Sequence, residues 1–268
     1  MKIAVIPNLN NSGVRELTDE ILERLRLLGA EAEEAQAPDG RESLVIAVGG
    51  DGTTLNIAKQ AALYGVCTLG INAGRLGFMS GLERNELHLL KNLVHGDYTV
   101  ENRMMLTAVV CENGQPDREY HALNDAVITR GDWARLIDIS VLCDGQAVTD
   151  TRADGLIIST PTGSTAYTMA AGGPVVSPDN SCFIVTPICP HSLMNRSIIF
   201  PSEKRLEIVV GSDKNNRSYL SIDGNDSIAV DASTKIIIKK SDYTAKLIKL
   251  KPDNFYEILN KKILERRY

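Results

Sequence analysis

Hydrophobic residues in the first hundred positions alternate between short continuous runs and stretches with helical spacing. Continuous apolar runs occur at residues 3–6, 44–48 and 66–71, and each has the length of a buried strand. Apolar side chains recur at helical spacing over residues 14–29, 53–64 and 85–94, with a glycine at or shortly after each end. Strands that alternate with helices predict a parallel sheet covered by helices, which is an α/β domain.

Near Asp97 the pattern changes to apolar runs that are rich in β-branched residues and are followed by turn-forming pairs. Asn113-Gly114, Asp144-Gly145 and Asp223-Gly224 are such pairs, and they indicate β-hairpins. The runs are residues 106–111, 137–143, 206–210, 218–222, 235–238 and 245–250. We therefore expect an all-β, sandwich-like second domain.

Helical spacing returns at residues 254–263, and we expect this C-terminal helix to pack back onto the first domain. The predicted boundaries are residues 1–98 plus 252–268 for the α/β domain and residues 99–251 for the β-rich domain. The acidic stretch at residues 31–34 is expected to be a solvated face.

Composition narrows the function classes without selecting one. The 268 residues carry a net charge of −5, which argues against a dedicated nucleic-acid binder but not against an anionic nucleotide ligand. The five cysteines form no C-x-x-C pair and the four histidines no ligand spacing, so we predict neither disulfides nor a protein metal site. An early apolar run ends at Pro7, and no run approaches the roughly 20 residues of a membrane span. We expect a soluble, cytoplasmic protein.

The most informative short stretch is Gly49-Gly50-Asp51-Gly52-Thr53, which lies between a predicted strand and a predicted helix. Ligands of parallel α/β sheets bind at the carboxyl ends of strands, and glycines let backbone N–H groups approach a phosphate. A carboxylate there repels phosphate unless it holds a cation or takes a proton from an attacking hydroxyl. Asp51 is therefore a candidate general base.

A second stretch combines many hydroxyls with glycines. Residues 151–174 read TRADGLIISTPTGSTAYTMAAGGP, in which a buried run at 156–158 leads into Ser159 and a helix-like segment at 166–171. These side chains offer short hydrogen-bond donors on an accessible backbone, and Tyr167 offers an aromatic face or a hydroxyl to an adenine. The chain has neither a G-x-G-x-x-G fingerprint nor a G-x-x-x-x-G-K-[ST] loop, which disfavours ordinary dehydrogenases and Walker-type NTPases.

Taken together, the motifs resemble those of the NAD kinase family. They are GGDGT at 49–53, GINAGRLGF at 70–78, NRMML at 102–106, Asn124-Asp125, and DGLIISTPTGSTAY at 154–167 with GGP behind it. The resemblance implies that ATP or another phosphoryl donor, with a divalent cation such as Mg²⁺ or Mn²⁺, phosphorylates the 2′-hydroxyl of the adenosine ribose of NAD to give NADP. It also implies an α/β nucleotide-binding domain and a β-rich dinucleotide-binding domain.

Carried over position by position, the resemblance makes Asp51 the general base. Asn225 stands where the family usually has Gln or His. Some family contacts cross between subunits, which implies a homodimer or homotetramer. The residues implied in binding are Gly49, Gly50, Asp51, Gly52, Thr53, Asn72, Phe78, Asn124, Asp125, Arg135, Arg152, Asp154, Thr162, Thr165, Ala166, Tyr167, Thr168, Met169, Ala170 and Asn225.

Three alternatives share part of this pattern. Lipid kinases of the diacylglycerol and sphingosine type have a GGDGT-like motif, but this chain has TPTGSTAY with GGP and no apolar stretch suited to a membrane surface. A 6-phosphofructokinase-like sugar kinase uses GGDG but has an α/β second half. An NADP-binding sensor without activity would have lost the acid at position 51.

Overall fold

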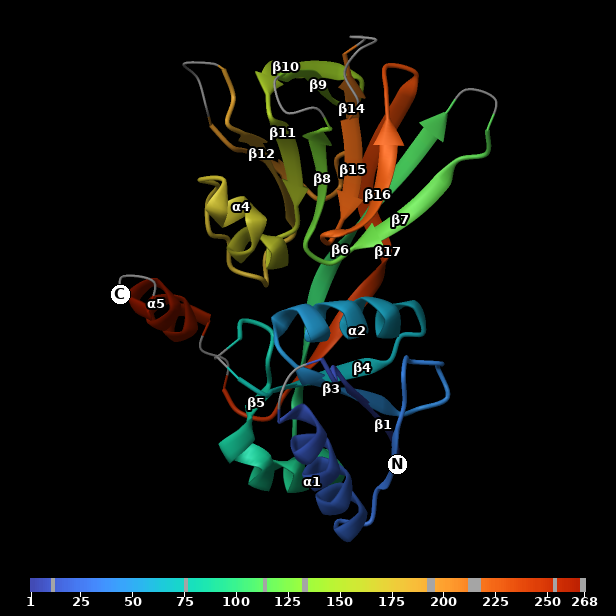
Figure 1. The fold of residues 1–268 in the computed structure, drawn as a ribbon, viewed down its shortest axis with the longest axis vertical. Helices are drawn as coiled ribbons and strands as arrows, with labels where there is room; N and C mark the ends of the chain where they lie inside the picture. The colour runs from blue at the N-terminus through green and yellow to red at the C-terminus, as the bar shows by residue number, and fades with distance from the viewer. Residues whose placement is uncertain are drawn as a thin grey trace. The chain divides into compact units, whose positions relative to one another are not determined.

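The computed structural model describes residues 1–10, 13–74, 77–112, 115–131, 135–191, 196–211, 218–252 and 255–265. The chain forms two compact units, Met1–Arg103 with Tyr243–Tyr268 (unit 1) and Met104–Asp242 (unit 2). It passes from one unit to the other inside two long strands, β6 (Thr99–Glu112) and β17 (Thr234–Lys249) (Figure 1). Unit 2 is therefore a continuous insertion in a discontinuous unit 1.

Unit 1 is built on a parallel sheet with strand order β17-β4-β3-β1-β2 and with β5 beside β4. Its central strands are buried on both faces because α1 packs on one face and α2 on the other (Figure 1). This burial explains why their sequences are continuous apolar runs rather than alternating ones. The bounds are β1 Lys2–Pro7, α1 Val14–Leu27, β2 Glu31–Glu34, β3 Leu44–Gly49, α2 Asp51–Leu63, β4 Cys67–Asn72, β5 Leu82–Glu83, η1 Arg84–Leu89 and α3 Leu90–His95.

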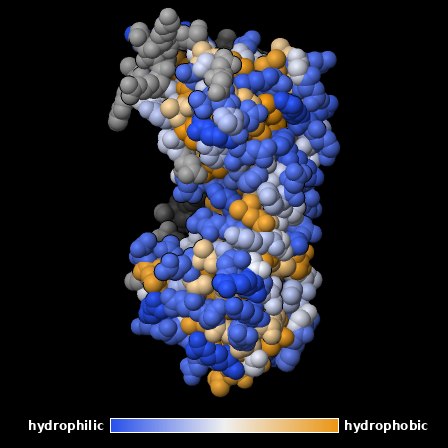
Figure 2. Space-filling model, turned by 90° about the vertical axis from the view of Figure 1, so that its right-hand side faces the viewer, coloured by the Kyte–Doolittle hydropathy of each residue, from blue (hydrophilic) through white to orange (hydrophobic). Residues whose placement is uncertain are grey.

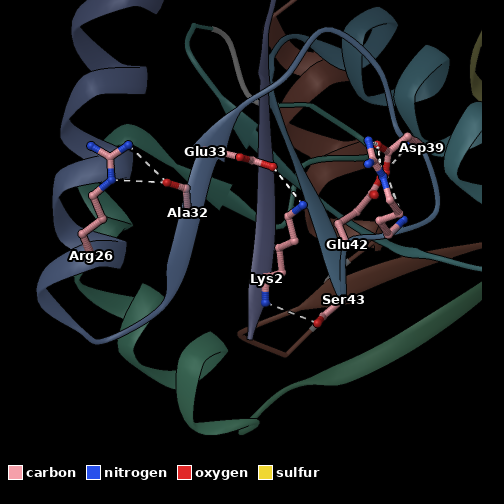
Figure 3. A network of polar contacts seen from close by, with 8 residues as sticks. Lys2, Arg26, Ala32, Glu33, Asp39, Glu42 and Ser43 are labelled. Carbon is pink, nitrogen blue, oxygen red and sulfur yellow. Dashed lines mark hydrogen bonds and ion pairs between the residues drawn. The ribbon is translucent and has the colours of Figure 1, made fainter.

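The edge strand β2 is a feature that the sequence analysis missed. Its glutamates are exposed, as expected for a solvated face, but Ala32 is buried and the segment pairs with β1. Arg26 donates to the Ala32 carbonyl, and Lys2 forms an ion pair with Glu33 (Figure 3). Exposed charges of this kind keep an edge strand from pairing with another chain.

Unit 2 consists of two antiparallel sheets that share one apolar core, so the predicted sandwich-like class is confirmed. One sheet has the order β13-β12-β11-β8-β15-β16, and the other contains β10-β9-β14-β17 with β6 and β7. The bounds are β7 Arg118–Ala122, β8 Asp125–Arg130, β9 Ile137–Cys143, β10 Gln146–Ala153, β11 Gly155–Ser159, η2 Thr162–Thr165, α4 Tyr167–Ala170, β12 Cys182–Ile188, β13 Ile198–Pro201, β14 Leu206–Val210, β15 Ser218–Ile222 and β16 Asn225–Val230.

Two of the three predicted hairpin turns can be examined in the structure. Asp144 and Gly145 have φ of 50° and 79°, and Asp223 and Gly224 have φ of 52° and 72°, as a type I′ turn requires. Asn113-Gly114 lies outside the described residues.

Several strand boundaries differ from the predicted ones. The runs at 235–238 and 245–250 belong to the single 16-residue strand β17, because the polar residues between them continue the extended backbone. The strands β7, β8, β10, β12, β13 and β16 were not predicted as such. β10, for example, is mostly exposed and has no apolar run to indicate it.

The C-terminal helix α5 (Phe255–Glu265) belongs to unit 1. Its Phe255 ring lies 6.1 Å from the ring of Phe78, measured between centroids. On the face shown in Figure 2, hydrophobic residues are scattered among hydrophilic ones, which is ordinary for a protein surface. In the described part of the chain, every helix is too short or too polar to cross a bilayer.

Candidate functional site

The predicted acid lies at the start of a helix. β3 ends at Gly49, Gly50 is the N-cap with extended backbone, and Asp51 is the first residue of the 13-residue helix α2. The amides of Thr53 and Thr54 donate to the Gly50 carbonyl and close the first turn. The apolar strand and the glycine turn therefore deliver Asp51 to the carboxyl edge of the parallel sheet.

Two consecutive backbone amides hold the carboxylate of Asp51. The N–H of Phe78 donates to Oδ2 and the N–H of Met79 donates to Oδ1, both at 3.0 Å. A Cβ on Gly77 would overlap Oδ1, so only glycine at this position lets the carboxylate reach the backbone. The loop after β4 thus fixes the orientation of the acid.

A lysine from the C-terminal helix completes the surroundings of this acid. Lys262 Nζ lies 3.1 Å from Asp51 Oδ2 and 4.3 Å from the centroid of the Phe78 ring. The two side chains of the ion pair are 24% and 34% exposed, so the pair is partly buried.

The glycines around Asp51 divide into two kinds. A Cβ on Gly49 would overlap the Thr53 side chain, so this glycine serves the packing of the turn. A Cβ on Gly50 or Gly52 would meet no protein atom within 4 Å. The space beside these two glycines is open to a ligand. Asn72, at the end of β4, is buried and accepts a bond from the Gly74 amide.

In unit 2, two segments hold the Asn124-Asp125 pair. The carboxylate of Asp223 accepts the amides of Leu123, Asn124 and Asp125 at 2.8–3.1 Å. The Thr160 amide donates to the Asn124 carbonyl, and a Cβ on Gly163 would overlap that carbonyl. Two segments therefore hold this pair in place: the turn between β15 and β16, and the stretch rich in glycines and hydroxyls at residues 151–174 (the glycine-hydroxyl stretch).

Asp125 is 5% exposed, and its environment disfavours the charged form. Burial, together with repulsion from the Asp223 carboxylate, raises the pKa of Asp125 from 3.8 to about 7. Asp125 therefore changes its charge near neutral pH.

Residues of the glycine-hydroxyl stretch have separate roles in the structure. Ser164 Oγ both accepts from the amide and donates to the carbonyl of Val176, and Thr168 is fully buried against Gly173. Tyr167 is 44% exposed and is available to a ligand. Thr162 is buried, Thr165 and Ala166 are partly buried, Met169 is partly buried and Ala170 is exposed.

Asp154 and Arg152 lie away from the cluster formed by Asn124, Asp125 and Asp223 (the Asn124 cluster). Asp154 and Thr160 flank the five-residue strand β11, so their backbones are about 20 Å apart. Asp154 pairs with Arg130 at 2.9 Å, and the exposed Arg152 lies 3.7 Å from Asp138. Arg135 is exposed. The exposed Asn225, by contrast, adjoins Asp223 in the turn and so belongs to the cluster.

Three site residues were missed in the sequence analysis. Gly77 lies in the GINAGRLGF stretch, where its motif was a usable signal, and Asp223 lies in a recognised hairpin turn. Lys262 is one of several lysines near the C-terminus, and no local pattern distinguishes it.

A cavity of about 220 Å³ also lies in unit 1, lined among others by Ser80, Glu83, Lys249, Lys251 and Glu257. Two of its lysines form ion pairs, Lys251 with Glu86 and Lys249 with Glu101. The Asp51 cluster, whose acid faces ligand-accessible glycines, is the stronger candidate.

Comparisons with known proteins agree on one family. Residues 30–98 match the ATP-NAD kinase N-terminal domain and residues 123–250 match the ATP-NAD kinase C-terminal domain. An NAD kinase of Thermoanaerobacter sp. is 38% identical, with 99% of each chain covered. One of Carboxydothermus hydrogenoformans is 43% identical, over 83% of this chain and 79% of its own.

Solved structures give the same result. An NAD kinase from Archaeoglobus fulgidus in complex with ATP has a TM-score of 0.79 and 29% identity, with 98% of each chain covered. A yeast NADH kinase complexed with NADH has a TM-score of 0.86 over 97% of this chain and 86% of its own, and at 24% identity it supports the fold. The lipid-kinase alternative is not favoured by these findings.

Proposed function

Because the chain belongs to the NAD kinase family, and so phosphorylates NAD to NADP with ATP, we propose that Asp51 is the general base of this reaction. The 2′-hydroxyl of the adenosine ribose attacks the terminal phosphorus of ATP. Asp51 accepts the hydroxyl proton as the new O–P bond forms, while the P–O bond to ADP breaks and ADP leaves.

The observation that carries this proposal is the pair of amides on the Asp51 carboxylate. A ribose hydroxyl is a poor nucleophile near neutral pH, and a positioned carboxylate contributes about 10²–10⁴-fold to the rate. Phosphoryl transfer depends mainly on placing the reactants in line, so a base whose oxygens are fixed by backbone suits the reaction.

The open space at Gly50 and Gly52 supports phosphate binding at the start of α2. Without side chains there, a phosphate can reach backbone N–H groups, and the positive end of the helix dipole favours the anion. Asp51 is then next to the group that is transferred.

For the divalent cation we propose that Mg²⁺ or Mn²⁺ enters on the ATP phosphates. Mg²⁺ typically binds substrate phosphates, water and one or two carboxylates, and it would neutralise charge on the transferring group. Across the described residues, no group of three or more His, Cys, Asp or Glu is arranged to hold a metal ion. Since the Asp51 carboxylate already accepts three donors, we assign it no metal.

For the dinucleotide we propose Asn124, Asp125 and the exposed Tyr167 as binding residues of unit 2. The Asp223 carboxylate and Gly163 fix the backbone of the Asn124-Asp125 pair, so both side chains extend from a fixed main-chain position. Fixed polar groups of this kind select one ligand geometry.

We also propose that Arg135, Arg152 and Asp154 serve the binding site of a neighbouring copy in a homodimer or homotetramer. Their support is the length of β11, which separates Asp154 from the Asn124 cluster of the same chain. Mixing Asp51→Asn with Arg152→Ala chains tests this. Activity above that of either variant alone is expected, and activity that never exceeds their average contradicts it.

The central experiment is the variant Asp51→Asn, with Asp19→Asn on an exposed face of α1 as its control. NADP is measured with a dehydrogenase that accepts only NADP. We expect kcat to fall about 10²–10⁴-fold in Asp51→Asn while NAD binding is retained. Wild-type turnover in Asp51→Asn would remove the general-base role.

A further inference from the structure

The C-terminal helix reaches the catalytic acid through two contacts on one of its faces. Phe255 and Lys262 are seven residues apart on α5, which places them on the same side of the helix two turns from each other. Phe255 lies against the Phe78 ring, and Lys262 lies over that same ring and beside Asp51. The position of Lys262 is therefore set by aromatic contacts as well as by charge.

Lys262 occupies one of the hydrogen-bond acceptor positions of the Asp51 carboxylate. An ionised carboxylate has about four lone-pair positions, two on each oxygen. Among the described residues, Oδ2 accepts from Phe78 N–H and from Lys262, whereas Oδ1 accepts only from Met79 N–H. One position, on Oδ1, is thus left for an incoming hydroxyl.

We propose that Lys262 is a positioning residue for phosphoryl transfer, holding Asp51 so that Oδ1 is the oxygen that takes the proton. The inference rests on the general-base role proposed above. Without the ammonium group, Oδ2 has a free lone pair and also becomes an acceptor for the hydroxyl. The nucleophile then has two competing partners, and the in-line geometry is populated for less of the time.

An isolated exposed ion pair would contribute little to the stability of the chain, because water and salt screen it. Lys262 differs because its partner is already bonded to two amides and because its ammonium also contacts an aromatic face. The expected effect is therefore on the rate of transfer rather than on the folding of the chain.

The test compares Lys262→Met, Lys262→Arg and the neighbouring Lys261→Met, whose side chain is exposed. Methionine keeps the length and apolar stem of lysine without its charge. We expect Lys262→Met to lower kcat about tenfold to a hundredfold, as misplaced catalytic groups typically do, with KM for NAD and ATP within about threefold. Lys262→Arg restores most of kcat, and Lys261→Met leaves it unchanged.

Four results overturn the proposal: an unchanged kcat in Lys262→Met, a raised kcat, a change confined to KM, or a fall that Lys262→Arg does not reverse. Asp51→Asn, assayed in parallel, separates this proposal from its premise. If Asp51→Asn is inactive and Lys262→Met is fully active, only the role of Lys262 is lost. If Asp51→Asn is fully active, the general-base role fails first. A thermal unfolding curve for each variant shows that the chain still folds.

Discussion

At the scale of single residues, Gly77 makes room for the carboxylate of Asp51. A methyl group at this position overlaps Oδ1 and comes close to Ser80 Oγ, at 2.7 Å. We expect Gly77→Ala to lower kcat at least about tenfold, because the acid must leave the two amides that orient it. Gly74→Ala is the comparison, since a Cβ there meets nothing within 4 Å. Equal activity of the two variants in the NADP assay would show that the close approach is unimportant.

Asp125 predicts a pH dependence of stability. Its pKa is about 7 in the folded protein against 3.8 in the unfolded chain, so the folded state binds more protons between these values. The free energy of unfolding therefore falls as pH rises through this window, and the neutral carboxyl contributes fully only below it. From about pH 5 to pH 8 the loss is on the order of 2–3 kcal/mol.

Urea unfolding of the wild type and of Asp125→Asn at the two pH values checks this. Asparagine stays neutral, so the variant is expected to lose less stability over the same pH interval. An equal loss of unfolding free energy in the wild type and in Asp125→Asn would mean that a different group titrates in this pH interval.

At the scale of elements, the two Asp-Gly hairpin turns have the same backbone conformation but make different contacts. Asp223 accepts three amides from residues 123–125 at the start of β8, whereas Asp144 accepts one amide and a lysine at an exposed turn. We expect Asp223→Ala to lower the free energy of unfolding by about 1–3 kcal/mol more than Asp144→Ala, since more buried donors lose their acceptor. Asp223→Ala should also raise KM for NAD. Equal stabilities in denaturant titrations of the two variants would contradict this.

The elements also show how far local sequence determines this fold. The strands of unit 1 were predictable because helices cover both faces and the sequence between turns is continuously apolar. Strands such as β10 were not, because an exposed strand is defined by its pairing partners rather than by its own residues. For the same reason the two runs in β17 looked like separate strands.

The residues of the candidate site were likewise predictable only where the local sequence indicates them. Asp51 was predictable because glycines, an acid and a strand–helix junction occur together in the sequence. Lys262 was not, since its meaning comes from a contact that spans 211 positions of the chain. The separation of Asp154 from Asn124 likewise became visible only when β11 was paired antiparallel with β8, which puts the two residues at opposite ends of the pair.

At the scale of the whole molecule, substrate binding should stabilise the folded chain. A ligand at a hundred times its Kd adds about 2.7 kcal/mol to the free energy of unfolding, which for a chain of this size raises Tm by roughly 5–10 °C. We expect NAD to produce this shift in the wild type and in Asp51→Asn, because the variant loses proton transfer rather than binding. A shift in the wild type alone would mean that Asp51 is needed for binding as well.

The contact between β17 and β4 has a consequence for how the protein is made. Lys246 pairs with Cys67 in the sheet of unit 1, and its ammonium bonds to the Gly65 carbonyl, 181 positions earlier. The ribosome synthesises Cys67 long before Lys246, so β4 lacks its β17 partner until nearly all of the message has been translated. A premature stop codon after unit 2 would thus damage the half of the protein that was synthesised first.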